Sequence, residues 1–207
     1  MEKRSLLDEL LTPTVDVLED IKKFLIFDDK DDFYYLQLLQ RKKENELLGS
    51  NSRVIKNYYI RSLKYLEDHY DEIKSLCDLF NARAMLRLNR RSYRKVAFKA
   101  MVNMANTMSN ADWLNIHRAY DHAIGDGHNE KIALWILDVD EEYNDEKFNE
   151  MKDLISASRP SGDKIEAVLP TKQGYHLITR GFDTREFREK FDDVSIHKDN
   201  PINLYIP

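Results

Sequence analysis

Asp138 and Asp140 are the residues whose types and spacing most directly predict chemistry in this sequence. They follow an unbroken apolar run, Ile132 to Leu137, and only Val139 separates them. A short apolar run with branched and aromatic residues predicts a buried strand, in which alternate side chains point to the same face. Two carboxylates on one face repel each other unless a cation lies between them. The pair therefore predicts a site for Mg²⁺ or Mn²⁺, which prefer oxygen ligands; the alternative is a solvated strand end.

A histidine lies in a second segment that could contribute to such a site. Residues 164–169 and the strand-like residues 175–179 predict a hairpin, with His176 on its second strand. The tight connection between the strands contains Thr171 and Lys172. Backbone amides in a turn of this kind can form a concave site for anions. By itself, His176 would more simply be a histidine packed on the sheet.

A third carboxylate follows near the carboxyl end of the chain. Asp199 comes after the short apolar strand predicted at residues 194–196, and a last strand is expected at 203–206. Asp193 precedes the first of these strands and competes with Asp199 for the role of a third acidic ligand. The sequence leaves this choice open.

Two arginines predict an anion site on a neighbouring strand. Residues 81–89 alternate in polarity, which places Arg83 and Arg87 on the face opposite the apolar side chains. Two guanidinium groups on one face repel each other, and phosphate oxygens would relieve that repulsion. The alternative is that both arginines reach water or pair with acidic residues elsewhere. The following helix, from Ser92 to Met108, contains basic residues and no acidic ones, and its methionines are expected to fill the core.

The elements that must position these residues predict an α+β protein with a mixed or antiparallel sheet covered by helices. Residues 1–80 have helical apolar spacing and predict an amino-terminal helical lobe or cap. Residues 81–207 alternate strands with helices and predict the core that carries the site.

Composition predicts a soluble, cytoplasmic protein. The 207 residues are 42% hydrophobic and 33% charged, and no apolar run reaches the length of a membrane span or of a signal peptide core. Cys77 is the only cysteine, which excludes an intrachain disulfide and a thiolate zinc site and fits a reducing compartment. The net charge of -5 argues against coating of nucleic acid by the whole surface, but the stretch from Arg83 to Lys99 is a basic patch.

The order of these motifs resembles the catalytic domain of archaeo-eukaryotic primases and primase-polymerases, including those of phages and mobile elements. That family has an apolar strand ending in Asp-x-Asp, a small residue-x-His on a hairpin, and a later strand leading to a third Asp. The corresponding segments here are I-L-D-V-D, P-T-K-Q-G-Y-H-L-I and S-I-H-K-D-N-P-I-N-L-Y-I-P. The resemblance covers roughly residues 82–207, and the closing strand has Asn203-Leu204-Tyr205 where family members often show an arginine.

The resemblance implies an RRM-like primase core and a nucleotidyltransferase that uses nucleoside triphosphates on a nucleic-acid template in DNA replication. Asp138, Asp140 and Asp199 would hold one or two Mg²⁺ or Mn²⁺ ions. The implied nucleotide-binding residues are His176, Thr171, Lys172, Arg83 and Arg87. The basic helix would follow the template backbone.

Two other functions remain open. A primase-like module without turnover could bind nucleic acid or a replication partner, which the small size and the missing arginine favour. A phosphohydrolase of the haloacid dehalogenase type also begins with a strand and Asp-x-Asp, but it expects threonine soon after the second aspartate. Glu141-Glu142-Tyr143 does not fit that expectation.

Overall fold

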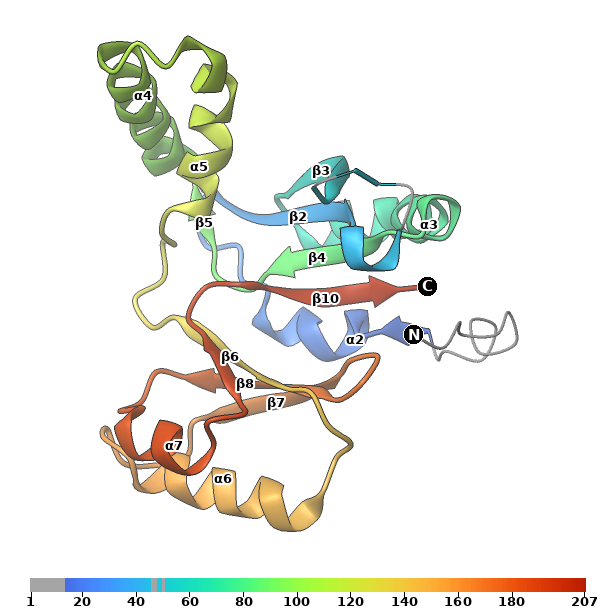
Figure 1. The fold of residues 1–207 in the computed structure, drawn as a ribbon, viewed down its shortest axis with the longest axis vertical. Coiled ribbons are helices and arrows are strands. Elements are labelled where there is room, and N and C mark those ends of the chain that lie inside the picture. The colour runs from blue at the N-terminus through green and yellow to red at the C-terminus, as the bar shows by residue number, and fades with distance from the viewer. Residues whose placement is uncertain (1–13, 46–47, 50) are drawn as a thin grey trace.

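The computed structural model describes residues 14–45, 48–49 and 51–207, which form two antiparallel sheets with helices around them (Figure 1). The first sheet has the order β1-β10-β4-β2-β3, with β5 paired to β2, and the second has the order β7-β8-β6-β9. The strands are β1 Val15–Asp16, β2 Asp32–Gln40, β3 Arg53–Ile60, β4 Arg83–Arg87, β5 Arg91–Ser92, β6 Leu134–Val139, β7 Ile165–Pro170, β8 Tyr175–Arg180, β9 Ser195–His197 and β10 Pro201–Ile206. The prediction of an α+β protein with an antiparallel sheet is confirmed.

The longer helices begin where the sequence supplies capping side chains. Ser92 and Asn144 each accept a hydrogen bond from a backbone amide three residues ahead, at the starts of α4 and α6. The α-helices are α2 Leu18–Ile21, α3 Leu63–Phe80, α4 Tyr93–Ser109, α5 Ala119–Gly125, α6 Asp145–Ala157 and α7 Arg185–Lys190. The described residues also include the 3₁₀ turns η1 Lys22–Phe24, η2 Lys42–Glu44 and η3 Trp113–Arg118.

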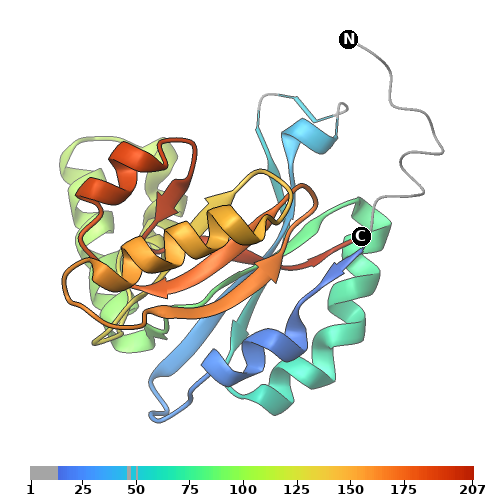
Figure 2. The same cartoon turned by 90° about the horizontal axis from the view of Figure 1, so that it is seen from below.

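The second sheet buries a different set of residues on each face. Leu137 and Val139 point toward α6 and α7, which cover one face (Figure 2) and form a core with Phe187. Ile136 points the other way and joins a larger core that includes Leu36 from the first sheet. Strand β6 is therefore buried on both sides before it reaches Asp138, which explains why Leu134 to Leu137 are all apolar.

The element order of this sheet is β6-α6-β7-β8-α7-β9, with β6 and β8 adjacent in the middle. The edge strands are β7 and β9. This arrangement brings the end of the apolar run next to the start of the hairpin strand that carries the histidine.

The prediction that residues 1–80 are helical is wrong for much of the described part. Strands β2 and β3 fall there, and α3 begins only at Leu63. Both strands belong to the same sheet as β4 and β10, so residues on either side of the predicted boundary at residue 80 form one sheet. Residues 1–13 of the predicted lobe lie outside the described residues.

A physical reason for this error is visible in β2. Phe33 and Tyr35 pack toward α4 and α5, while Leu36 and Leu38 pack into the core between the sheets. A strand that is buried on both faces lacks the alternation of apolar and polar residues that identifies a half-buried strand.

None of the helices in the described residues is long and apolar enough to cross a membrane.

Candidate active site

The pairing of β6 with β8 places Asp138 directly opposite His176. The imidazole Nε2 donates a hydrogen bond to Asp138 Oδ1 at 3.1 Å. His176 is buried, whereas the Asp138 side chain is about one-third exposed. This hydrogen bond holds the pKa of Asp138 below its usual value, because it stabilises the carboxylate form. The arrangement favours an ionised carboxylate at the surface of the sheet.

The turn between β7 and β8 lies beside the exposed Asp140. Thr171 Oγ1 accepts a hydrogen bond from Gly174 N at 3.0 Å, and Thr171 N donates to the Gly174 carbonyl at 2.9 Å. A Cβ atom on Gly174 would lie 1.9 Å from the Val139 carbonyl oxygen. Only glycine lets this turn pack against the end of β6, so it fixes Thr171 and Lys172 near the two aspartates.

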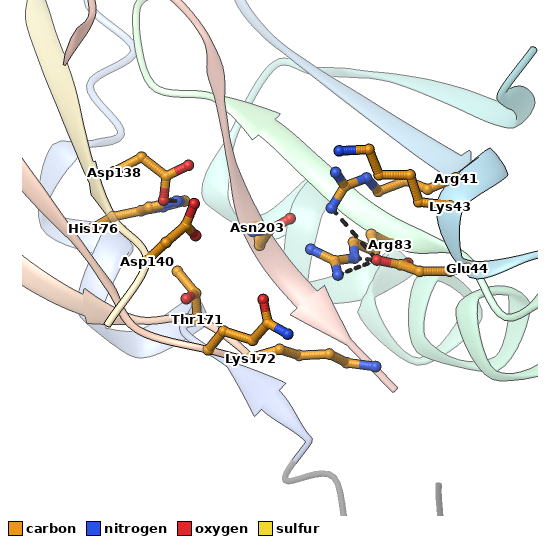
Figure 3. Close-up of a pocket in the computed structure, with 11 residues that line it drawn as sticks. Arg41, Lys43, Glu44, Arg83, Asp138, Asp140, Thr171, Lys172, His176 and Asn203 are labelled. Atoms are coloured by element: carbon orange, nitrogen blue, oxygen red, sulfur yellow. Dashed lines mark hydrogen bonds and ion pairs between the residues drawn. The ribbon is translucent and has the colours of Figure 1, made fainter. Parts of the chain in front are cut away.

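A cleft of about 540 Å³ connects these residues with the first sheet. In Figure 3, Asp138, Asp140 and His176 form one wall, Thr171 and Lys172 lie at the turn, and Asn203 of β10 lies between the walls. The residues that line the cleft are Arg41, Lys43, Glu44, Arg83, Asp138, Asp140, Thr171, Lys172, Gln173, His176 and Asn203. Five of the predicted site residues are therefore brought together, namely Asp138, Asp140, His176, Thr171 and Lys172, and Arg83 joins them from the first sheet.

The wall opposite the aspartates is basic. Arg83, which is buried, forms an ion pair with Glu44, with Nε 3.0 Å from Oε2 and a second contact through Nη2. Arg41 Nη1 lies 3.4 Å from Glu44 Oε1. Glu44 thus bridges two guanidinium groups, and Lys43 adds a further cation to the same wall. Guanidinium and ammonium groups of this kind suit phosphate oxygens.

Asp199 lies apart from this cleft. Its carboxylate contacts Arg91 Nη2 at 2.6 Å and accepts a hydrogen bond from Asn89 Nδ2 at 3.1 Å. The Asn89 side chain also bonds the backbone of Leu134 at the start of β6. Asp138 is four residues further along that strand, or about 13 Å. The structure does not bring Asp199 to the two cleft aspartates, because the fully buried Arg91 holds it as a counter-charge.

Arg87 and Asp193 also lie outside the cleft lining. Arg87 donates to the backbone carbonyl of Asp199, and its Nη1 lies 3.8 Å from the carboxylate of that residue. Burial, with the nearby Arg91, lowers the pKa of Arg87. Asp193 pairs with Lys147 at 2.6 Å beside α6. Neither alternative for the third carboxylate therefore reaches the Asp138 side of the cleft.

Four further residues line the cleft that were not predicted from the sequence: Arg41, Lys43, Glu44 and Asn203. The first three belong to the short 3₁₀ turn η2 and its N-cap, which follow β2. The signal that could have identified them is the basic run Arg41-Lys42-Lys43, but it was included in a region predicted to be a helical lobe.

The carboxylates of Asp138 and Asp140 fit a hard divalent cation whose remaining ligands are water and substrate oxygens. Within residues 14–45, 48–49 and 51–207, no group of three or more His, Cys, Asp or Glu side chains is arranged to hold a metal ion. Mg²⁺ commonly takes one or two protein carboxylates and completes its shell with water and substrate phosphates. Asp138 and Asp140 match that donor set, with the basic wall nearby for the phosphates.

Comparisons with family models, with curated proteins and with solved structures find no match to this chain.

Proposed function

We propose that this protein is a nucleotidyltransferase of primase-polymerase type, which binds a nucleoside triphosphate with Mg²⁺ or Mn²⁺ in the cleft and acts on a nucleic-acid template. The observation that supports this proposal is that an acidic wall and a basic wall face each other across the cleft. Asp138 and Asp140 line one side, and Arg83, Arg41 and Lys43 line the other. A metal-bound triphosphate has the complementary pattern, with a cation on one side and phosphate oxygens on the other.

The order of elements in the second sheet supports the family resemblance. A β-α-β-β-α-β order with its first and third strands adjacent is the pattern of RRM-like and ferredoxin-like modules. In the proposed core, Asp138 is the penultimate residue of the first of these strands and His176 is the second residue of the third. The proposal therefore assigns residues 134–197 to an RRM-like primase core.

Each wall has a distinct role in the proposed reaction. Asp138 and Asp140 would hold the cation, which supplies charge neutralisation at the phosphates and at the attacking hydroxyl. His176 keeps Asp138 ionised and oriented. Arg83 and Lys172 would contact phosphate oxygens. The backbone amides of the turn at Thr171 would also bind phosphate oxygens.

A second candidate function is a primase-like module that binds nucleic acid or a replication partner without turnover. The observation that favours it is the position of Asp199, whose carboxylate is engaged by Arg91 rather than exposed in the cleft. Glu44 is paired with Arg83 and Arg41, so Asp138 and Asp140 would be the acidic ligands, and such a cleft could bind a metal-nucleotide complex without catalysing transfer.

A transfer assay separates the two candidates. Labelled nucleotide, Mn²⁺ and a primed template are incubated with the wild type, Asp138→Asn, Asp140→Asn and the control Glu142→Gln. Glu142 is an exposed carboxylate close in sequence that does not line the cleft. The transferase account predicts extension by the wild type and the control, and none by the two aspartate variants. Template binding by all four proteins, with extension by none, would instead support the module.

A further inference from the structure

Helix α4 exposes a continuous apolar surface. Phe98, Met101 and Val102 are each more than half exposed, at 64%, 65% and 54%, and Trp113 and Leu114 follow just beyond the helix at 58% and 87%. The α4 outer face is defined here as the exposed apolar residues of this helix: Ala97, Phe98, Met101, Val102, Met104, Ala105 and Met108. The prediction that the methionines of this helix fill the core is therefore wrong for all three.

The opposite side of α4 contains the residues that hold it in place. Val96 and Ala100 are buried, and Asn103 Nδ2 donates to the Ala119 carbonyl of α5 at 3.1 Å. Thr107 lies on the same side and donates to the Asn103 carbonyl at 2.8 Å. Small and polar residues thus attach α4 to α5, and the larger apolar residues face outward. Apolar surface of this extent on a helix is typical of an interaction site.

The spacing on the outer face fits a second helix as its partner. Ala97, Met101, Met104 and Met108 recur at intervals of four, three and four residues. This is the heptad spacing with which two helices pack along a shared seam. The small Ala97 allows close approach, and the methionines adapt to the opposing surface.

The charges at the two ends of α4 favour a second copy in antiparallel orientation. Arg94 and Lys95 lie in its first turn, and the helix contains no acidic residue. Asp112 follows its carboxyl end, where the backbone carbonyls also carry partial negative charge. Parallel copies would bring the basic ends together. An antiparallel pair with its axis level with residue 103 would bring Phe98 beside Met108 of the partner subunit. It would also bring the first turn of α4, with Arg94, to the carboxyl end of the partner helix, where the chain turns at Ala111 and Asp112 of the partner subunit lies.

We propose that this protein forms a two-fold symmetric dimer through the α4 outer face. Figure 1 shows α4 and α5 at one end of the molecule, where α4 packs on β2 with one side and a second copy can reach its other side. The cleft of the candidate active site is lined by other elements, so it stays open in such a dimer.

Sedimentation equilibrium of the full chain tests the dimer directly. The wild type is expected at twice the mass of one chain. Met101→Glu would place two unpaired carboxylates in the seam and raise the dissociation constant by roughly 100-fold. Ile132→Glu is the matched control, since Ile132 is also 65% exposed but lies outside α4, and it should remain dimeric. Circular dichroism confirms that each variant is folded, and Phe98→Lys provides a second disruption of the same seam.

Charge exchange tests the orientation. Arg94→Asp alone and Asp112→Arg alone should each weaken the dimer about tenfold, and the double variant should recover most of that loss. The proposal would be overturned if the wild type stayed monomeric at every concentration. It would be overturned equally if the monomeric wild type bound an unrelated protein instead. Dimers that tolerate Met101→Glu, or a double variant weaker than both single variants, would overturn it as well.

Discussion

The Nε2 atom of His176 lies 3.1 Å from the Oδ1 atom of Asp138, across a pair of antiparallel strands whose register places the two residues opposite each other. The hydrogen bond joins a buried imidazole to a partly exposed carboxylate. It links the two sequence motifs that suggested a site, and it gives Asp138 a lowered pKa.

This pair makes stability depend on pH. The pKa of Asp138 is lower in the folded protein than its ordinary value of 3.8. The ionised Asp138 therefore makes its full contribution to the free energy of unfolding above pH 3.8, and this contribution is lost as the pH falls through the folded pKa. Asp138→Asn should lower the free energy of unfolding by about 1 kcal/mol at neutral pH, the usual size of one such hydrogen bond at a partly exposed site. Urea unfolding of the wild type and of Asp138→Asn at several pH values should show the difference in unfolding free energy becoming smaller below about pH 4. A difference that grows on acidification would contradict the assignment.

Asp199 is expected to contribute to stability rather than to bind a metal. Asp199→Asn removes the counter-charge of the fully buried Arg91, and it should lower the free energy of unfolding by about 3 kcal/mol. Asp193→Asn is the control, because Asp193 pairs with Lys147 at a more exposed position and should change stability by less than about 1 kcal/mol. Urea unfolding of both variants measures the contrast. Equal and small effects would show that the Arg91 pair does not stabilise the fold.

Glu44 is expected to compete with phosphate for the basic wall. Its carboxylate occupies both Arg83 and Arg41, and a phosphate group must displace it to contact those guanidinium groups. Glu44→Gln should therefore bind a nucleoside triphosphate about tenfold more tightly than the wild type, because it removes one negative charge that competes with the phosphates. Calorimetric titration in the presence of Mn²⁺ measures the affinity. Weaker binding in this variant would imply that Glu44 orders the arginines for the ligand instead of blocking them.

Gly174 is expected to be irreplaceable in the turn beside the aspartates. The Cβ of Gly174→Ala would lie 1.9 Å from the Val139 carbonyl oxygen, so the turn must move away from β6. We expect a loss of about 2 kcal/mol in the free energy of unfolding, comparable with other strained substitutions. Gly125→Ala is the control, since nothing lies within 4 Å of its Cβ, and it should be neutral or slightly stabilising. Equal unfolding free energies in the two variants would contradict the close approach.

The elements of the second sheet could be predicted from the sequence because their signals are local. The apolar run before Asp138, the turn residues before Tyr175 and the cap of α6 each define an element within a few residues. The pairing of β6 with β8 then places His176 beside Asp138. The strands β2 and β3 were missed because their neighbours in the first sheet are distant in sequence, and burial on both faces of β2 removes the usual alternation.

The composition of the cleft could be predicted only in part. Asp140 and Asp199 are the same residue type after similar short strands, and local sequence does not distinguish them. What separates them is Arg91, which lies 108 residues before Asp199 and reaches it only in the folded protein. Arg41 and Glu44 reach the cleft for the same reason, since their position depends on the pairing of β2 with β4.

The metal-nucleotide site is tested most directly by the melting temperature of the protein with Mn²⁺ and a nucleoside triphosphate. A ligand that binds the native state, present at a concentration of about 100 times its dissociation constant, adds about 2.7 kcal/mol to the free energy of unfolding. This should raise the melting temperature by several degrees. We expect this rise for the wild type with both ligands together and its loss in a variant carrying both Asp138→Asn and Asp140→Asn. A wild-type melting temperature that does not change, or an equal rise in the double variant, would contradict the claim that these two aspartates form a metal-nucleotide site.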